Sequence, residues 1–282
     1  MKYDEKFVGN ITTRGEIRSD FGQYWNQISP ENEGKWASVE PQQNNYRWES
    51  LDAIYSYAED NYMPFKEQPL VWGSQVQSWL DRLEDDGIAA EIEEWMQEFC
   101  SRYPNTALID VVYEATPGHL PSEVAKRAFG DDWIIRAFEL AHQHCPKSVL
   151  LLTDYGVLSG NTAEFIDMAT PAVNAGVVDA LGLEAHGLEK VTLADIEARL
   201  NQVLALGLPV YITEYDVDIE NDAAQLEVMQ SQFPLFYTHP NVVGITLWGY
   251  VERMTWAAHA GLIYQDGTKR PAMTWLMDYL GR

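Results

Sequence analysis

The stretch SVLLLTDYGVLSGNTAEFIDMATPAVNAGVVDALGLEAH, residues 148–186, contains the unit from which the rest of the chain is built. Short apolar runs of the kind that form strands lie at its two ends, 148–154 and 180–186. Between them, residues 162–176 have the apolar spacing that is typical of an amphipathic helix. A strand, a helix and a second strand in this order predict two parallel strands joined by a crossover helix.

The same alternation runs along the whole chain. Further strands are expected at 7–11, 24–28, 63–72, 108–114, 208–214 and 242–248. Further helical patterns occupy 51–60, 89–103, 133–144, 193–207 and 223–239. Several strands are apolar throughout, as in sheets covered on both faces, and several helices end in a glycine before the next strand. Eight strands alternating with helices over 282 residues predict an α/β fold, a single-domain (β/α)8 barrel spanning residues 1–282.

Composition excludes several classes of function. The chain carries a formal net charge of −24, which repels phosphate backbones and anionic lipid, so neither nucleic acid nor a membrane is expected as a partner. No stretch approaches the roughly 18 to 20 apolar residues of a membrane helix. The opening MKYDEKFVGN has no apolar core of the kind found in secretory signals, and the compartment is left open.

No metal or cofactor is expected. The six histidines include no HExxH pattern and no spacing typical of a zinc site, and the chain has no P-loop and no GxGxxG run. Cys100 and Cys145 each follow a helical pattern, and we interpret them as buried free thiols rather than as a disulfide.

Two glutamates end apolar strands, and both are candidate catalytic residues. Glu114 closes LIDVVYE (108–114), and Glu214 closes LPVYITE (208–214). In a (β/α)8 barrel the active site lies at the carboxyl ends of the strands, so the two side chains should face one barrel mouth. Two carboxyl groups across a sugar can cleave a glycosidic bond, and a separation of about 5 to 5.5 Å implies retention of configuration.

At these strands the sequence resembles glycoside hydrolase family 10, the endo-β-1,4-xylanases. The similarity covers nearly the whole chain, and six short motifs occur in the order that the family shows. They are ISPENEGKW (28–36), LVWGSQ (70–75), DVVYEA (110–115), GLEAHG (182–187), YITEYDV (211–217) and ITLWGYVERMTW (245–256). The resemblance implies hydrolysis of internal β-1,4-xylosidic bonds in xylan, with Glu114 as general acid/base and Glu214 as nucleophile.

The resemblance also implies which residues contact the sugar. The upstream sugar would be held by Glu31, Asn32 and Lys35, and His186 would bond the nucleophile. The full set of residues implied to bind substrate is Glu31, Asn32, Lys35, Trp72, Gln75, Tyr113, His186, Trp248 and Trp256. A polysaccharide substrate, a monomeric chain and a secreted or periplasmic location are implied as well.

Several positions depart from the family's pattern. Gln68 and Pro69 stand where the family usually has a His-Thr pair, and Tyr113 replaces the Asn before the acid/base. The other altered positions are Thr153 and Gly156, which replace the two Asn residues of the family's Asn-Asp-Tyr-Asn-like run, Glu184 in place of Gln, and His259 among small residues. Each lost donor removes on the order of 0.5 to 1.5 kcal/mol of substrate binding.

These departures leave three functions open. The first is a xylanase-like glycosidase. The second is a xylanase scaffold remodelled, naturally or by design, to bind a small apolar or aromatic ligand, with a carboxylate as general base for proton abstraction. The third is a carbohydrate-binding protein without catalysis.

Overall fold

The computed structural model describes residues 6–282. Strands and helices alternate from β1 (Phe7–Ile11) to α10 (Pro271–Leu280). The chain divides into two compact units, which are described one at a time. The first unit contains the chain up to Glu31, Tyr155–Thr162 and Leu183–Arg282, and the second contains Asn32–Asp154 and Ala163–Gly182.

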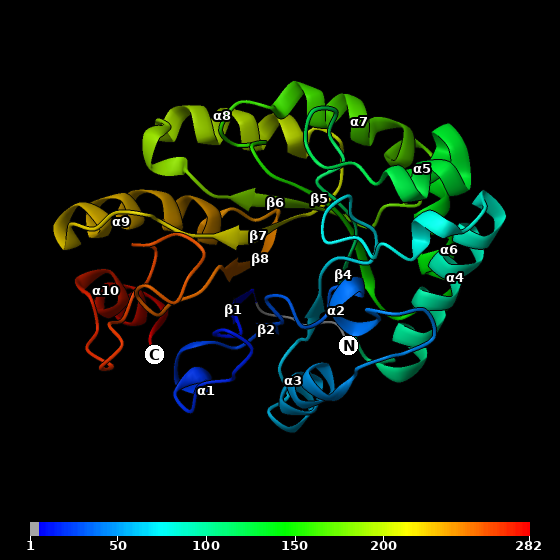
Figure 1. Cartoon of the computed structure of the whole chain (residues 1–282). Helices are drawn as coiled ribbons and strands as arrows, with labels where there is room; N and C mark the ends of the chain where they lie inside the picture. Colours follow the sequence, from blue (N-terminus) through cyan, green and yellow to red (C-terminus); the bar gives the residue numbers. More distant parts are fainter. Residues whose placement is uncertain (1–5) are drawn as a thin grey trace. The chain divides into compact units, whose positions relative to one another are not determined.

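In the first unit, four strands pair side by side in parallel, in the order β2-β1-β8-β7 (Figure 1). Besides β1 they are β2 (Ile28–Ser29), β7 (Val210–Tyr215) and β8 (Val242–Leu247). The pairing of β7 with β8 shifts register twice, and the second shift lies between Ile212 and Tyr215. Parallel strands place their carboxyl ends at the same edge, so Glu214 lies at an edge that also receives the loop after β8.

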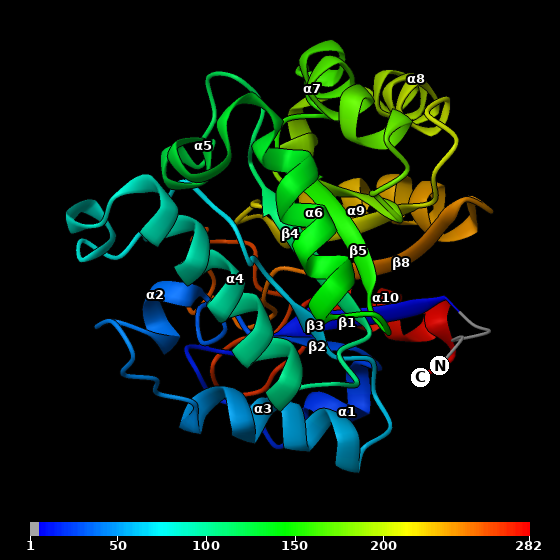
Figure 2. The same ribbon diagram turned by 90° about the vertical axis from the view of Figure 1, so that its right-hand side faces the viewer.

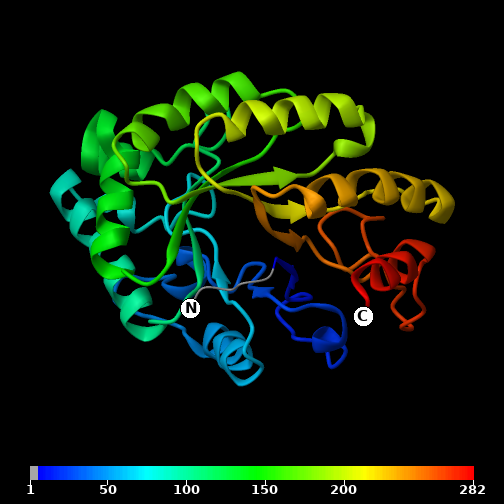
Figure 3. The same cartoon turned by 180° about the vertical axis from the view of Figure 1, so that it is seen from behind.

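The first unit's helices cover these strands. They are α1 (Phe21–Tyr24), the single 3-10 turn η3 (Leu188–Lys190), α8 (Leu193–Leu204), α9 (Asp222–Thr238) and α10. Helix α9 lies against β8 and beside α10 (Figures 1 and 3). Phe233 of α9 meets the ring of Tyr279 of α10 edge-on, with 6.0 Å between ring centroids. This apolar contact closes the outer layer of the first unit.

In the second unit, β3 (Lys66–Glu67), β4 (Leu108–Tyr113) and β5 (Val149–Asp154) pair in parallel in chain order. A bulge between Asp110 and Val112 shifts the register of β4 against β5, and bulges of this kind re-aim the side chains that follow. Strand β6 (Ala180–Ala185) is shared, because its first three residues belong to the second unit and its last three to the first.

The second unit's helices lie outside its strands. They are α2 (Trp36–Val39), α3 (Glu49–Asp60), η1 (Leu80–Arg82), α4 (Asp85–Arg102), α5 (Glu123–Phe129), η2 (Gly130–Asp132), α6 (Trp133–His144) and α7 (Thr162–Asn174). Helices α4 and α6 lie side by side along the strands (Figure 2). Fully buried Trp95 stacks between Trp36 and Trp48, so part of the chain's high aromatic content serves core packing.

Most expected elements are present, but two strands are much shorter than expected. In 24–28 the strand begins only at Ile28. The backbone N–H of Val8 donates to the side chain of Asn26 instead of to a backbone carbonyl of the neighbouring strand. In 63–72 the strand is limited to Lys66–Glu67, and Pro69 has no N–H to donate. Pairing returns only as an isolated bridge between Val71 and Val112. Helices α5 and α10 were not expected from the sequence.

The interpretation of the two cysteines as free thiols was wrong. Cys100 and Cys145 form a disulfide, with their Cα atoms 5.3 Å apart. Cys100 lies in the last turn of α4 and Cys145 directly follows α6, and the packing of the two helices brings their carboxyl ends together. Among the described residues, no helix combines the length and the hydrophobicity that a membrane span needs.

Candidate active site

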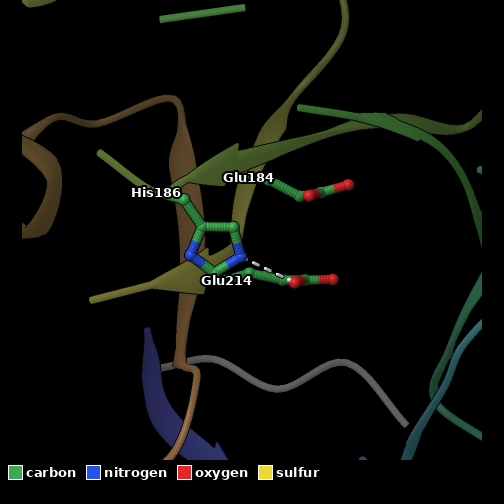
Figure 4. Close-up of side chains that lie close together, drawn as sticks. All are labelled: Glu184, His186 and Glu214. Carbon is green, nitrogen blue, oxygen red and sulfur yellow. Dashed lines mark hydrogen bonds and ion pairs between the residues drawn. The ribbon is translucent and has the colours of Figure 1, made fainter. Parts of the chain in front are cut away.

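Two buried glutamates lie side by side on neighbouring strands of the first unit. Glu214 comes from β7 and Glu184 from the end of β6, and their side chains point the same way (Figure 4). Their exposed fractions are 2% and 4%. A buried ionised carboxylate is costly unless charge or hydrogen bonds compensate it, so this pair needs a nearby cation.

His186 supplies that cation. It follows β6 directly, and its Nε2 lies 2.9 Å from Oε2 of Glu214 (Figure 4). Its Nδ1 lies 2.9 Å from Oδ2 of Asp216. Burial lowers the pKa of His186, but the hydrogen bonds and the negative charges of Asp216 and Glu214 outweigh burial and raise its pKa well above 6.5. Both ring nitrogens therefore donate, and the imidazolium fixes the orientation of Glu214.

The same residues have the donor set of a metal site. Glu184, His186 and Glu214 each offer a ligand atom within 4.8 Å of the others. A histidine ligand directs a ring nitrogen at the metal, whereas both ring nitrogens of His186 are directed at carboxylate oxygens of Glu214 and Asp216.

The pKa of His186 predicts how stability depends on pH. A histidine whose pKa is higher in the folded than in the unfolded chain contributes stability that is complete below about pH 6.5 and is lost as the pH rises through the folded value. The free energies of unfolding of the wild type and of His186→Gln, measured with urea, should therefore differ most near pH 6. The difference should shrink by about 1.4 kcal/mol per pH unit above that. Two curves that stay parallel from pH 6 to pH 9 would contradict this assignment.

The loop after β8 places the indole of Trp256 against His186 and Asp216. Trp256 donates from Nε1 to Oδ2 of Asp216 over 2.6 Å, and its ring lies 4.7 Å from the ring of His186. It is 61% exposed, so one face of the indole is open to solvent. Trp248, at the end of β8, is buried, and its backbone N–H bonds the carbonyl of Tyr215.

A buried arginine holds the loop that carries Trp256. Arg270 forms ion pairs with Asp222 and Glu252 and also donates to the backbone carbonyls of His259 and Gly261. His259 is therefore part of a structural network: its Nδ1 lies 3.0 Å from Glu252, and its backbone N–H bonds Asp218.

In the second unit, Glu114 lies directly after β4 in a left-handed conformation, with φ of 53°. Its backbone N–H bonds the carbonyl of Thr153, and its side chain accepts a 2.7 Å hydrogen bond from Nε1 of Trp72. Lys35 lies over the Trp72 ring, 4.9 Å from its centroid, and donates to Asn32. The second unit thus gathers four residues that the sequence predicted for the site.

The altered positions fall into two groups. Gln68 is buried, while Pro69 lines a small hollow of about 30 Å³ beside Lys35 and Trp72, together with Gln75, which was expected to bind substrate. Thr153 instead serves the interior, because its hydroxyl donates to Asp110, which also pairs with Lys66.

Two further predicted residues belong to the first unit. Gly156 has φ of 71°, in a turn after β5 where three backbone N–H groups converge on its carbonyl. The backbone N–H of the half-buried Glu31 donates a hydrogen bond to the hydroxyl oxygen of Thr12.

A family model for Glycosyl hydrolase family 10 matches residues 3–279. The chain belongs to glycosyl hydrolase family 10. Among related proteins, endo-1,4-beta-xylanase B of Cellvibrio japonicus (strain Ueda107) is 51% identical over 275 residues, which make up 97% of this chain and 46% of that protein. The chain therefore spans less than half of that relative's length. Endo-1,4-beta-xylanase A of Caldicellulosiruptor saccharolyticus is 26% identical over 83% of the chain and 77% of its own length.

Solved structures confirm the expected fold class of this family 10 chain. Native xylanase 10B from Thermotoga maritima superposes with a TM-score of 0.88 at 24% identity, covering 98% of this chain and 95% of that one. The chain is a (β/α)8 barrel, as its alternation of strands and helices predicted.

Sequence reasoning missed two members of the family 10 site. Asp216 holds both His186 and Trp256, and it lies two residues after Glu214 in the same motif. Because side chains alternate along a strand, residues two apart share a face, and this signal was present in YITEYDV. Arg270 had no such signal, since its partners lie in loops 9 to 51 residues away.

Proposed function

We propose that this chain hydrolyses internal β-1,4-xylosidic bonds of xylan with retention of configuration. The observation that carries the proposal is the His186 imidazolium between Glu214 and Asp216, in a chain that belongs to glycosyl hydrolase family 10. The relatives named endo-1,4-beta-xylanase support xylan as the substrate.

In this mechanism Glu214 attacks the anomeric carbon. A nucleophilic carboxylate must be ionised and fixed in direction, and the adjacent imidazolium favours both. Glu114 protonates the leaving oxygen and then takes a proton from the attacking water, as the second carboxyl group of a retaining glycosidase does. The geometry that retention requires is a separation of about 5 to 5.5 Å between the two carboxyl groups.

The remaining residues bind the sugar chain in this proposal. Glu31, Asn32 and Lys35 hold the sugar upstream of the bond that is cleaved. The open face of Trp256 offers an apolar platform for a sugar ring, and the buried Trp248 belongs to the same sugar-binding set. Trp72, Gln75 and Tyr113 complete the set.

We also propose that residues 1–282 act as one catalytic domain and as a monomer. The β-1,4-xylose backbone of xylan is uncharged and does not repel a chain with a net charge of −24, whereas nucleic acid and an anionic membrane do. The expected partner is thus the polysaccharide alone.

Incubation with β-1,4-xylan tests the proposal. Short xylo-oligosaccharides should be released, and proton NMR during the first minutes should show the β-anomer before mutarotation. No reducing sugar at high protein concentration would reject the proposal, and so would an α-anomer as the first product. Binding of xylo-oligosaccharides without cleavage would indicate a carbohydrate-binding protein, and turnover of a small aromatic compound alone would indicate a remodelled pocket.

A further inference from the structure

Trp72 and Tyr113 are fixed next to each other by the backbone. Each directly follows one partner of the isolated bridge between Val71 and Val112. The N–H of Val71 bonds the carbonyl of Val111, and the N–H of Tyr113 bonds the carbonyl of Val71. The two side chains therefore start from main-chain positions that cannot move apart without breaking these bonds.

The Tyr113 ring presses on the indole of Trp72. The two rings meet edge to face, at an angle of 90° with 5.3 Å between centroids, and Tyr113 is only 5% exposed. The Lys35 ammonium lies 4.9 Å from the centroid of the same indole and is itself held by Asn32. Edge-to-face aromatic pairs and cations over a ring both favour one orientation, so the indole is clamped.

The clamped indole determines where the Glu114 carboxyl group points. Two hydrogen bonds fix the Glu114 main chain. Its N–H donates to the carbonyl of Thr153, and its carbonyl accepts from the N–H of Leu120. In the side chain, Oε2 accepts a 2.7 Å hydrogen bond from Nε1 of Trp72. Because this N–H donates to Oε2, it favours Oε1 as the oxygen that carries the proton.

We propose that Tyr113 is a positioning residue for proton transfer by Glu114, acting through the indole of Trp72. The inference rests on the proposed function, because it assigns Glu114 the role of acid/base. Tyr113 does not itself exchange a proton with substrate. Its ring limits the motion of Trp72, and the Trp72 N–H then keeps the carboxyl group aligned with the leaving oxygen.

Substrates with different leaving groups separate this role from a merely structural one. A dinitrophenolate leaves without being protonated, whereas phenol or a sugar hydroxyl needs the proton that Glu114 supplies. The ratio kcat/KM reports the step that breaks the glycosidic bond. A misaligned Glu114 should therefore slow phenyl β-xylobioside and xylan by a larger factor than 2,4-dinitrophenyl β-xylobioside, whereas a lost sugar contact slows both aryl substrates equally.

The experiment measures kcat/KM on both aryl xylobiosides for the wild type, Tyr113→Ala and Tyr113→Phe. In Tyr113→Ala the ratio of the phenyl to the dinitrophenyl rate should fall about 10- to 100-fold, part of the 10²- to 10⁴-fold that acid–base catalysis contributes. Tyr113→Phe keeps the ring and should return this ratio to the wild-type value. If the alanine variant does not fold, Tyr113→Leu replaces it, with the same expected fall.

A double variant tests the route through Trp72. Trp72→Phe removes the N–H and should lower the same ratio, and adding Tyr113→Ala should lower it no further. Equal losses on both substrates, an unchanged ratio in Tyr113→Ala, or additive effects in the double variant would each overturn the inference. A wild type that cleaves neither substrate nor xylan overturns the proposed function, and the role of Tyr113 falls with it.

Discussion

Replacing Glu214 by Ala is expected to lower kcat/KM on xylan by about 10⁴-fold or more, because no covalent intermediate can then form. The variant should fold, since removing one buried carboxylate leaves His186 paired with Asp216. The measurement is the initial rate of reducing-sugar release at equal protein concentrations, with circular dichroism as a check on folding.

Glu184 provides a matched control for Glu214. It is a second buried carboxyl group in the same cluster, so Glu184→Gln removes a charge of the same sign from the same place. The loss of activity in Glu184→Gln should be no more than about tenfold, because Glu184 forms no covalent bond to the sugar in the proposed mechanism. A Glu214→Ala variant with near wild-type activity, or equal losses in both variants, would refute the role of Glu214.

Azide distinguishes the two proposed catalytic roles. With an activated aryl xylobioside, azide should restore the activity of Glu214→Ala by attacking the anomeric carbon of the substrate directly, which gives the α-glycosyl azide. It should restore the activity of Glu114→Ala by attacking the covalent intermediate, which gives the β-glycosyl azide. The opposite pairing of products would exchange the two assignments.

Removing the disulfide is expected to lower the free energy of unfolding by about 4 kcal/mol. The bridge joins residues 45 positions apart, and closing a loop of that length restricts the unfolded chain by about this amount. Urea unfolding of the wild type and of Cys100→Ala/Cys145→Ala should show the difference under oxidising conditions.

Reduction provides the control for the disulfide. In the presence of a reductant, the wild type and the double variant should unfold at similar urea concentrations. Activity should survive in the double variant, because Cys100 and Cys145 precede β4 and β5, at the opposite strand ends from Glu114. Equal unfolding midpoints without reductant would contradict the prediction.

The sequence predicted the alternation of elements better than their ends. Apolar runs such as 108–114 and 208–214 became strands because covered parallel strands need apolar side chains on both faces. The runs 24–28 and 63–72 formed only short strands. In the first the Asn26 side chain takes a backbone hydrogen bond from Val8, and in the second Pro69 has no N–H to donate to a neighbouring strand. The disulfide was missed because it depends on how α4 packs on α6, which no local pattern reports.

The candidate site was predictable where its residues end strands. His186 was expected beside Glu214 and lies there, while Trp72 was expected at the site and bonds Glu114. The roles of Asp216 and Arg270 could not be read in the same way, because they act through other side chains and through backbone carbonyls. Thr153 was expected only as a position where a pocket Asn is lost, and its hydroxyl donates to buried Asp110, a role that no local pattern reports.

The guanidinium of Arg270 donates hydrogen bonds to backbone carbonyls of the segments after β7 and after β8. These carbonyls include those of Ile219, Glu220 and Gly261. Any amino acid supplies the same oxygen. Asp222 and Glu252 must stay, because their carboxylates pair with Arg270, and so must Gly261, where a Cβ would meet the backbone of Glu252. Other side chains along these two segments can diversify during evolution while the path of the main chain stays constant. New sugar preferences could arise on this frame by single substitutions, without a prior rebuilding of the loops.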